Sequence, residues 1–263
     1  MSLAFNSKPA LVAYITCGDP DLRTSEEIAL AAIDAGASVI ELGVPFSDPV
    51  ADGPVIQRAS ERALRHGTSL GEVLKIAGSI RKQRPHAGLI VFSYLNPILR
   101  FGMEAFCAAA RDAGVDGALL IDLPIEEAGD YVSAMRRHQL ATIFLGAPTS
   151  TNKRLKQISQ LSTGFIYAVS RTGVTGERKD MTGDAREMVG RIRRVSQLPV
   201  AVGFGISTPA QVAEVAGFAD AAVVGSAIVH LVENTSAAGA ALAVGDFVRE
   251  LIAGARRSSA GGA

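Results

Sequence analysis

The sequence predicts an α/β fold, a single (β/α)8 TIM barrel with a parallel eight-stranded core. Short apolar runs alternate with longer helical patterns along the 263 residues. The runs are apolar on successive residues, as expected of parallel strands that are buried on both faces. There are eight such runs, and one barrel of this class typically needs about 250 residues. An open doubly wound sheet is the alternative.

The elements follow in order along the chain. Strands are expected over residues 11–16, 38–42, 89–94, 117–121, 141–145, 165–169, 199–203 and 221–224. Helices are expected near 25–35, where Thr24 or Ser25 would open the first one, and near 104–113, 126–138, 184–195 and 209–215. Gly53-Pro54 can open a further helix. The segments DAGASVIEL, DAGVDGALL and AGFADAAVV each end a helix near glycine and enter a strand, as repeated βα units would.

These elements predict one domain over residues 1–255, with extra short helices at its carboxyl-terminal face and a disordered tail over 256–263. Equal numbers of basic and acidic residues, 26 each, argue against a nucleic-acid partner. The apolar run 10–17 is too short for a membrane span and lacks the features of a secretory signal, so we expect a cytoplasmic protein. Cys17 and Cys107 have no metal-ligand spacing and are expected as reduced core residues.

The segment ELGVPFSDPVADGP carries the clearest candidate chemistry. Glu41 ends the second strand, and active sites of such barrels lie at the carboxyl ends of the strands. Partial desolvation there would raise the pKa of Glu41 and suit it to proton transfer. Asp52 follows in a loop stiffened by proline. The segment alone leaves other interpretations open: backbone N–H groups could satisfy Glu41, and Asp52 could be a turn or helix N-cap residue, while Asp48 in Ser-Asp-Pro is expected to be structural.

Glycine-bearing stretches follow the last three strands: SRTGVTGER, GFGIST and VGSAIV. Barrels often bind phosphate in this region, through backbone N–H groups and the start of a short helix. The candidates are Gly176, Gly205, Gly225 and Ser226. Alternatively, Gly203 and Gly205 serve close packing and Ser226 is an ordinary N-cap. Arg171 could contact a ligand or clamp the loop.

Seven segments, in order, resemble the tryptophan synthase alpha chain family: AYITCGDPD, ELGVPFSDPVADGP, YLNPI, IDLPIEE, YAVSRTGVTG, GFGIS and VGSAIV. The resemblance implies retro-aldol cleavage of indole-3-glycerol phosphate to indole and glyceraldehyde 3-phosphate. It implies that Glu41 is the general acid/base and that Asp52 holds the indole N–H. No metal or organic cofactor is implied.

The same resemblance assigns the remaining site residues. The implied indole pocket is lined by Tyr14, Phe92, Tyr94, Leu119, Ile121 and Tyr167. A core role is an alternative for Phe92 and Leu119. The loop holding Arg171 and Thr175 would close over the site, with Thr175 bonding Asp52. Gly176, Gly205, Gly225 and Ser226 match the phosphate-binding positions.

The resemblance also implies a partner, a beta chain that uses pyridoxal phosphate to convert the indole to tryptophan in an αββα assembly. Residues 45–52 and 94–101 would form the contact surface. Two segments depart from the family's pattern: MSLAFNSKPALVAY leaves little room for the helix that usually covers the barrel bottom, and GERKDMTGD is unusual. Other functions compatible with the fold are a stand-alone lyase, a non-catalytic barrel subunit and an isomerase of another phosphosugar.

Overall fold

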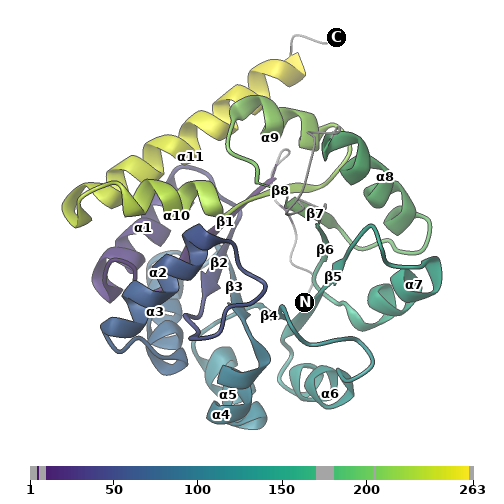
Figure 1. The fold of residues 1–263 in the computed structure, drawn as a ribbon, viewed down its shortest axis with the longest axis horizontal. Coiled ribbons are helices and arrows are strands. Elements are labelled where there is room, and N and C mark those ends of the chain that lie inside the picture. Colours follow the sequence, from purple (N-terminus) through teal and green to yellow (C-terminus); the bar gives the residue numbers. More distant parts are fainter. Residues whose placement is uncertain (1–4, 6–9, 170–180, 204, 261–263) are drawn as a thin grey trace.

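The computed structural model describes residue 5 and residues 10–169, 181–203 and 205–260. Eight parallel strands pair in sequence order, and β1 also pairs with β8, so the barrel is closed (Figure 1). The strands are β1 Ala10–Thr16, β2 Val39–Gly43, β3 Gly88–Ser93, β4 Gly117–Leu120, β5 Ala141–Gly146, β6 Ile166–Val169, β7 Val200–Gly203 and β8 Ala221–Val224. The predicted barrel is confirmed, and the open sheet is excluded.

Helices surround this barrel, as Figure 1 shows. In the described residues they are α1 Leu22–Asp34, α2 Pro54–Arg65, α3 Leu70–Gln83, α4 Leu95–Phe101, α5 Met103–Asp112, α6 Gly129–Arg137, α7 Asn152–Leu161, α8 Met181–Arg193, α9 Pro209–Ala216, α10 Ser226–Glu233 and α11 Ala237–Ala260. Helix α11 packs along α1 and α9. Two short helices, α4 and α10, begin within two residues of the carboxyl end of a strand.

The start of α1 corrects the prediction from sequence. Asp21, rather than Thr24 or Ser25, is the N-cap: its carboxylate accepts hydrogen bonds from the backbone N–H of Thr24 at 2.8 Å and from the Thr24 hydroxyl at 2.7 Å. Ser25 instead lies inside the helix and accepts a bond from the Gly18 N–H at 2.9 Å. The helix therefore begins three residues earlier than expected.

Both faces of the strands are buried, which explains their unbroken apolar sequences. The inner face forms a core inside the barrel, made of Ala10, Val12, Val39, Ile90, Leu119, Ala141, Ile143, Phe165, Ala201, Ala221 and Val223. The outer face packs under the helices in a second, larger core. Cys17 and Cys107 are free and belong to this outer core, as predicted.

Two of the three repeated helix-to-strand segments, DAGVDGALL and AGFADAAVV, carry an aspartate that bonds a strand at the amino-terminal end of the barrel. Asp116 accepts a hydrogen bond from the Leu89 N–H at 2.8 Å, and Asp220 accepts one from the Val200 N–H at 2.9 Å. Each aspartate, placed just before its own strand, satisfies the start of the preceding strand. The sequence repetition therefore reflects strand pairing as well as helix ending.

Phe5 covers the inner core from the same end. Its ring lies 5.5 Å from that of Phe165, and it packs against the residues inside the barrel. One aromatic side chain thus packs on the inner core at this end of the barrel.

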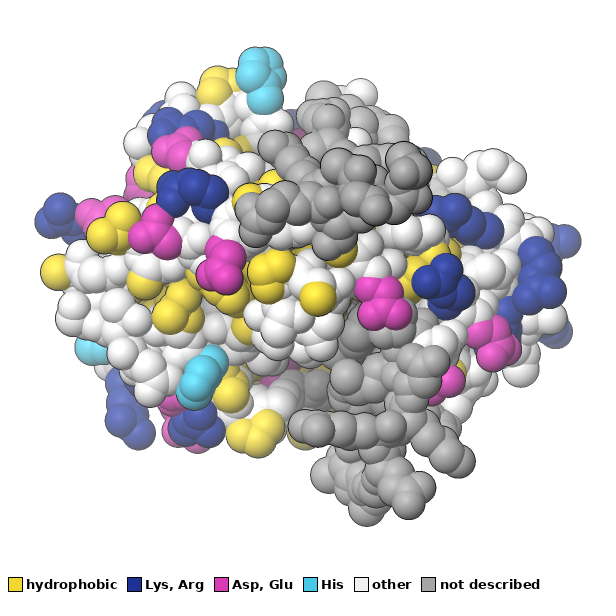
Figure 2. Space-filling view, turned by 90° about the horizontal axis from the view of Figure 1, so that it is seen from above, with side chains coloured by type: hydrophobic (Ala, Val, Ile, Leu, Met, Phe, Trp, Pro, Cys, Tyr) yellow, Lys and Arg dark blue, Asp and Glu magenta, His cyan; other side chains and the backbone are white. Residues whose placement is uncertain are grey.

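No helix in the described part of the chain is long and apolar enough to cross a membrane. On the face seen in Figure 2, the visible Lys and Arg side chains are interspersed with Asp and Glu.

Candidate active site

Glu41 is a buried carboxyl group on the inner face of the barrel. It stands in register between Tyr14 of β1 and Ile90 of β3, and it is 1 % exposed. Neither carboxyl oxygen has a hydrogen-bond partner among the described residues. Burial raises the pKa of Glu41 to about 8. The interpretation that backbone N–H groups satisfy this side chain is therefore wrong, and Glu41 is suited to carry a proton near neutral pH.

Asp52 lies in the loop that joins β2 to α2. The Tyr94 hydroxyl donates a 3.0 Å hydrogen bond to its Oδ2 and accepts one of 3.0 Å from the Ala51 N–H. Burial raises the pKa of Asp52 to about 6, and the bond from Tyr94 opposes this rise. Gly53 is the N-cap of α2, without any side-chain cap, so the N-cap interpretation of Asp52 is wrong.

The structure brings both acids to the same mouth of the barrel. The pKa of the Tyr14 hydroxyl is raised, and burial is the largest cause. The negative charge of Asp52 raises it further, and that of Glu41 adds a smaller rise. Both carboxylates thus lie within electrostatic reach of one hydroxyl group. Asp48 lies outside this cluster: it is exposed and accepts a 2.6 Å hydrogen bond from the Ser47 hydroxyl.

The predicted pocket residues lie in two kinds of position, on or beside the inner core and at the ends of strands. Phe92, Ile121 and Tyr167 pack against the inner core, and Leu119 is part of it, consistent with its alternative core role. The rings of Tyr14 and Phe92 meet edge to face at 5.2 Å. Ile121 and Tyr94 each follow directly after a strand, β4 and β3 respectively. Tyr94 is also the N-cap of α4, and its ring lies 5.0 Å from that of Phe46.

Two glycines at strand ends make room for the tyrosines. A Cβ atom at Gly43 would lie 2.4 Å from the Tyr14 hydroxyl, and one at Gly203 would lie 2.4 Å from the Tyr167 hydroxyl. The close-packing interpretation of Gly203 is therefore correct. Gly43 was not singled out from sequence, although it stands two residues after Glu41 and shares its strand face.

The candidate phosphate positions lie beyond β7 and β8. Gly225 is the N-cap of α10 and no side chain caps the helix, so Ser226 is its first residue and not the N-cap. The uncapped N–H groups of this first turn suit an anion. Gly205 has a φ of +74°, with open space where a side chain would stand. Arg171, Thr175 and Gly176 lie outside the described residues, as does most of the segment GERKDMTGD.

In the described ranges, no three or more His, Cys, Asp or Glu side chains come together as a metal site would require. The described part of the candidate site has two acids with different pKa values, aromatic and aliphatic side chains, and a helix start that suits an anion.

The chain is similar to known proteins over nearly its whole length. Residues 2–251 match the tryptophan synthase alpha chain family. The tryptophan synthase alpha chain of Solibacter usitatus is 50% identical over 246 residues, which cover 93% of this chain and 92% of the relative. That of Geobacter sulfurreducens is 48% identical over 249 residues, covering 95% and 94%.

Solved structures agree with this comparison. Tryptophan synthase subunit alpha from Legionella pneumophila superimposes with a TM-score of 0.88 at 36% identity, covering 95% of this chain and 93% of that one. A ligand-free tryptophan synthase from M. tuberculosis gives a TM-score of 0.86 at 37% identity, covering 95% and 94%.

Proposed function

The chain belongs to the tryptophan synthase alpha chain family, and from that premise we propose how its own residues cleave indole-3-glycerol phosphate. It is the alpha subunit of tryptophan synthase, a lyase. The observation that carries the assignment of roles is the state of Glu41. Its carboxyl group is fully buried, both oxygens lack a hydrogen-bond partner in the part of the chain that the structure describes, and its pKa is near 8. Burying such a group is costly, and such groups concentrate where proton transfer is needed.

Glu41 acts as both acid and base. Its protonated carboxyl donates the proton to carbon C3 of the indole ring, and positive charge develops at the ring nitrogen. The bond from C3 to the glycerol carbon then breaks, and its electrons neutralise that charge. The Glu41 carboxylate takes the proton from the hydroxyl on the glycerol carbon, which becomes the aldehyde. Glu41 ends protonated again, so the step balances without an added reactant.

Asp52 stabilises the charge that appears at the ring nitrogen. As a carboxylate it accepts a hydrogen bond from the indole N–H, which becomes stronger as the ring becomes positive. The pKa values support this division of roles: near pH 7 Asp52 is mainly ionised, with a pKa of about 6, while Glu41 keeps its proton. Thr175 would bond Asp52 when its loop, which also carries Arg171, closes over the substrate.

The rest of the site binds the two ends of the substrate. The indole ring lies among Tyr14, Phe92, Tyr94, Leu119, Ile121 and Tyr167. The phosphate lies at Gly176, Gly205, Gly225 and Ser226, where backbone N–H groups and the α10 dipole favour an anion. The chemistry is acid–base catalysis by side chains, so we propose that this chain needs no cofactor and that pyridoxal phosphate belongs to the beta partner.

Proteins of this family work with a beta chain, and we propose an αββα assembly for this one. Large apolar side chains are exposed on the two segments that would contact the partner: Val50 at 86 %, Leu99 at 57 % and Phe101 at 38 %. Exposed apolar residues gathered on neighbouring segments are typical of protein interfaces.

The test is indole release from indole-3-glycerol phosphate by the purified chain, with and without a beta chain. Slow release alone and much faster release with the partner is the expected result. Fast release by the chain alone would instead indicate a stand-alone lyase. No release under either condition would contradict the proposal, leaving a non-catalytic subunit or an isomerase of another phosphosugar.

A further inference from the structure

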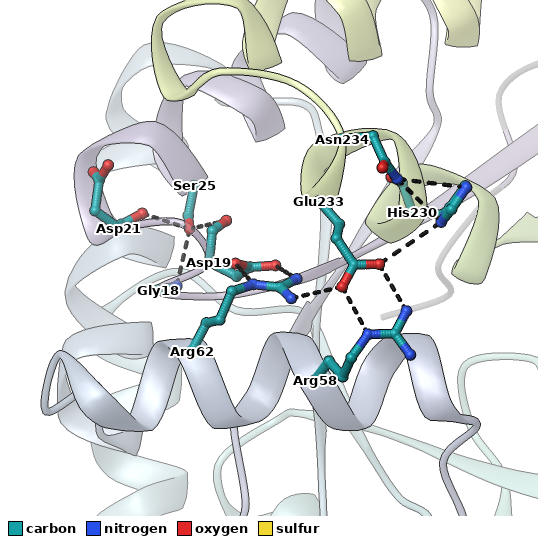
Figure 3. A network of polar contacts seen from close by, with 9 residues as sticks. All are labelled: Gly18, Asp19, Asp21, Ser25, Arg58, Arg62, His230, Glu233 and Asn234. Atoms are coloured by element: carbon teal, nitrogen blue, oxygen red, sulfur yellow. Dashed lines mark hydrogen bonds and ion pairs between the residues drawn. The ribbon is translucent and has the colours of Figure 1, made fainter.

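Ion pairs join helix α2 to the two segments beside it (Figure 3). Arg58 donates two hydrogen bonds to Glu233 at the end of α10, both of 2.7 Å. Arg62, one turn further along α2, donates to the same Glu233 at 2.8 Å. Arg62 also pairs with both oxygens of Asp19, in the loop after β1, at 2.8 and 2.9 Å. Two arginines on one helix face thus hold two carboxylates from different βα units.

The carboxylates of this network are held more firmly than those of isolated ion pairs on the surface. Isolated exposed ion pairs contribute little to folding stability. Bidentate arginine–carboxylate pairs in a connected network have fixed geometry and stronger hydrogen bonds. The Asp19 side chain is only 3 % exposed and the Glu233 side chain 19 %. The hydrogen bonds from Arg58 lower the pKa of Glu233 to about 2, so Glu233 stays ionised throughout the working range of pH.

Both helices in the network begin at the proposed site. Helix α2 starts right after Asp52, and Gln57 in its first turn donates a 2.9 Å hydrogen bond to the Asp52 carbonyl. Helix α10 starts at Gly225 and Ser226. The apolar contact under the network is made by Ala59 of α2, Val229 of α10 and Tyr14. The far end of the phosphate helix is therefore bound to the helix that carries the Asp52 loop.

We propose that Glu233 is a positioning residue of the lyase reaction: through Arg58 and Arg62 it sets the separation between Asp52 and the phosphate-binding start of α10. The inference rests on the proposed function. Asp52 and the phosphate site bind opposite ends of one substrate, yet they belong to units that follow β2 and β8. A small error in their separation would misplace the indole ring over Glu41, and errors of about 1 Å can cost 10²-fold in rate.

The test compares kinetics of indole release in Glu233→Gln, which keeps the shape and removes the charge, with Asp34→Asn. Asp34 forms a comparable bidentate pair with Arg84, at 2.6 and 2.7 Å, far from the site. We expect kcat to fall about tenfold or more in Glu233→Gln and to stay within about twofold in Asp34→Asn. Arg58→Gln is a second variant, because the Arg58 side chain is 48% exposed and its loss leaves no carboxylate buried without a partner. Replacing Arg62 is avoided, because it would leave the buried Asp19 without its arginine partner.

Two further measurements separate positioning from general support. Glycerol 3-phosphate, which occupies only the phosphate end, should bind Glu233→Gln as tightly as the unmodified chain. In a chain that already carries Asp52→Asn, Glu233→Gln should lower kcat much less than it does in the unmodified chain, because its effect acts through Asp52.

The inference is overturned if Glu233→Gln and Arg58→Gln both retain kcat within about twofold, or if the loss is as large in the Asp52→Asn background. If Glu233→Gln does not fold, Arg58→Gln alone decides between these outcomes. An unmodified chain that releases no indole overturns the proposed function and this inference together, whereas an active chain with unaffected variants overturns the inference alone.

Discussion

The Tyr94 hydroxyl lies 3.0 Å from Oδ2 of Asp52 and 3.0 Å from the backbone nitrogen of Ala51. One side chain from the end of β3 therefore holds both the carboxylate and the backbone of the loop after β2. Because it donates to Asp52, this hydroxyl favours the ionised form of the acid. The proposed electrostatic role of Asp52 thus depends on a tyrosine that is also one of the proposed pocket residues.

Tyr94→Phe removes this hydroxyl and keeps the ring. The pKa of Asp52 should rise above its value of about 6, since the bond that lowers it is lost. The acid limb of the kcat/KM profile, which we expect near pH 6, should move to higher pH, and kcat/KM at pH 7 should fall about two- to tenfold. Steady-state kinetics between pH 5 and 9 would measure both effects.

Tyr131→Phe is the matched control. Its hydroxyl donates a 2.8 Å hydrogen bond to the Ala118 carbonyl in the outer core, away from the two acids. This variant should lose about 1 kcal/mol of stability and leave the pH profile in place. If the acid limb of the kcat/KM profile did not move in Tyr94→Phe, Asp52 would not be the group whose ionisation causes it.

Glu41→Gln should abolish proton transfer while the substrate still binds. The amide is nearly isosteric, but it neither donates the catalytic proton nor accepts one. We expect kcat to fall about 10²- to 10⁴-fold, with the affinity for glycerol 3-phosphate unchanged. If the kcat of Glu41→Gln stayed within a few-fold of that of the unmodified chain, Glu41 would not be the proton donor and acceptor.

The same substitution should stabilise the chain in a pH-dependent way. The pKa of Glu41 is raised to about 8 in the folded state, so between about pH 4.5 and 8 the folded chain holds a proton that the unfolded chain has lost. The stability of the unmodified chain should therefore fall as pH rises through this window, by up to about 1.4 kcal/mol per pH unit from this group. Denaturant unfolding at pH 4.5, 6 and 8 should show Glu41→Gln gaining most at pH 8. An equal difference at all three values would contradict the assignment.

Phe5→Ala should weaken the amino-terminal end of the barrel. Phe5 packs on Phe165 and the inner core, and it is partly exposed, so its loss should cost roughly 1–2 kcal/mol. For a domain of this size that lowers Tm by several degrees. Calorimetry would test this, with Phe5→Leu as the variant that keeps an apolar side chain. Indole release at 25 °C should not change, since the site lies at the other end.

The strands could be placed from the sequence to within one residue, because strands buried on both faces need unbroken apolar runs. Helices were harder to place. Helix α3 carries Gly71 and Gly78, which weaken its helical signal, and α7 buries only Leu155 and Ile158. The start of α10 was expected, but its N-cap is Gly225 and not Ser226. Local signals are weak where tertiary packing supplies most of the stability of a helix.

For the site, Glu41 and Asp52 could be proposed from their positions after a strand, but their surroundings could not. The bond from Tyr94 to Asp52 joins residues 42 positions apart, and Arg62 pairs with Glu233 across 171 positions. Such contacts depend on the directions in which side chains leave different βα units. No local pattern records those directions, so the pairs become visible only in the folded chain.

The surface proposed to contact the beta chain can be tested by a substitution that does not touch the two acids. Leu99 lies on α4 and is 57 % exposed. Leu99→Asp places a charge that would have to be buried against the partner, which is costly without a counter-ion. Indole release by the isolated chain should stay within about twofold, while activation by the beta chain should fall at least about tenfold.

Leu242→Asp is the matched control, because Leu242 is 71 % exposed on α11, outside the proposed surface. It should retain full activation. Titrating each variant with a beta chain, and following indole release, gives both the apparent affinity and the maximal activation. If Leu99→Asp were activated as well as Leu242→Asp, α4 would not contact the partner, and the interface would have to be placed elsewhere on the barrel.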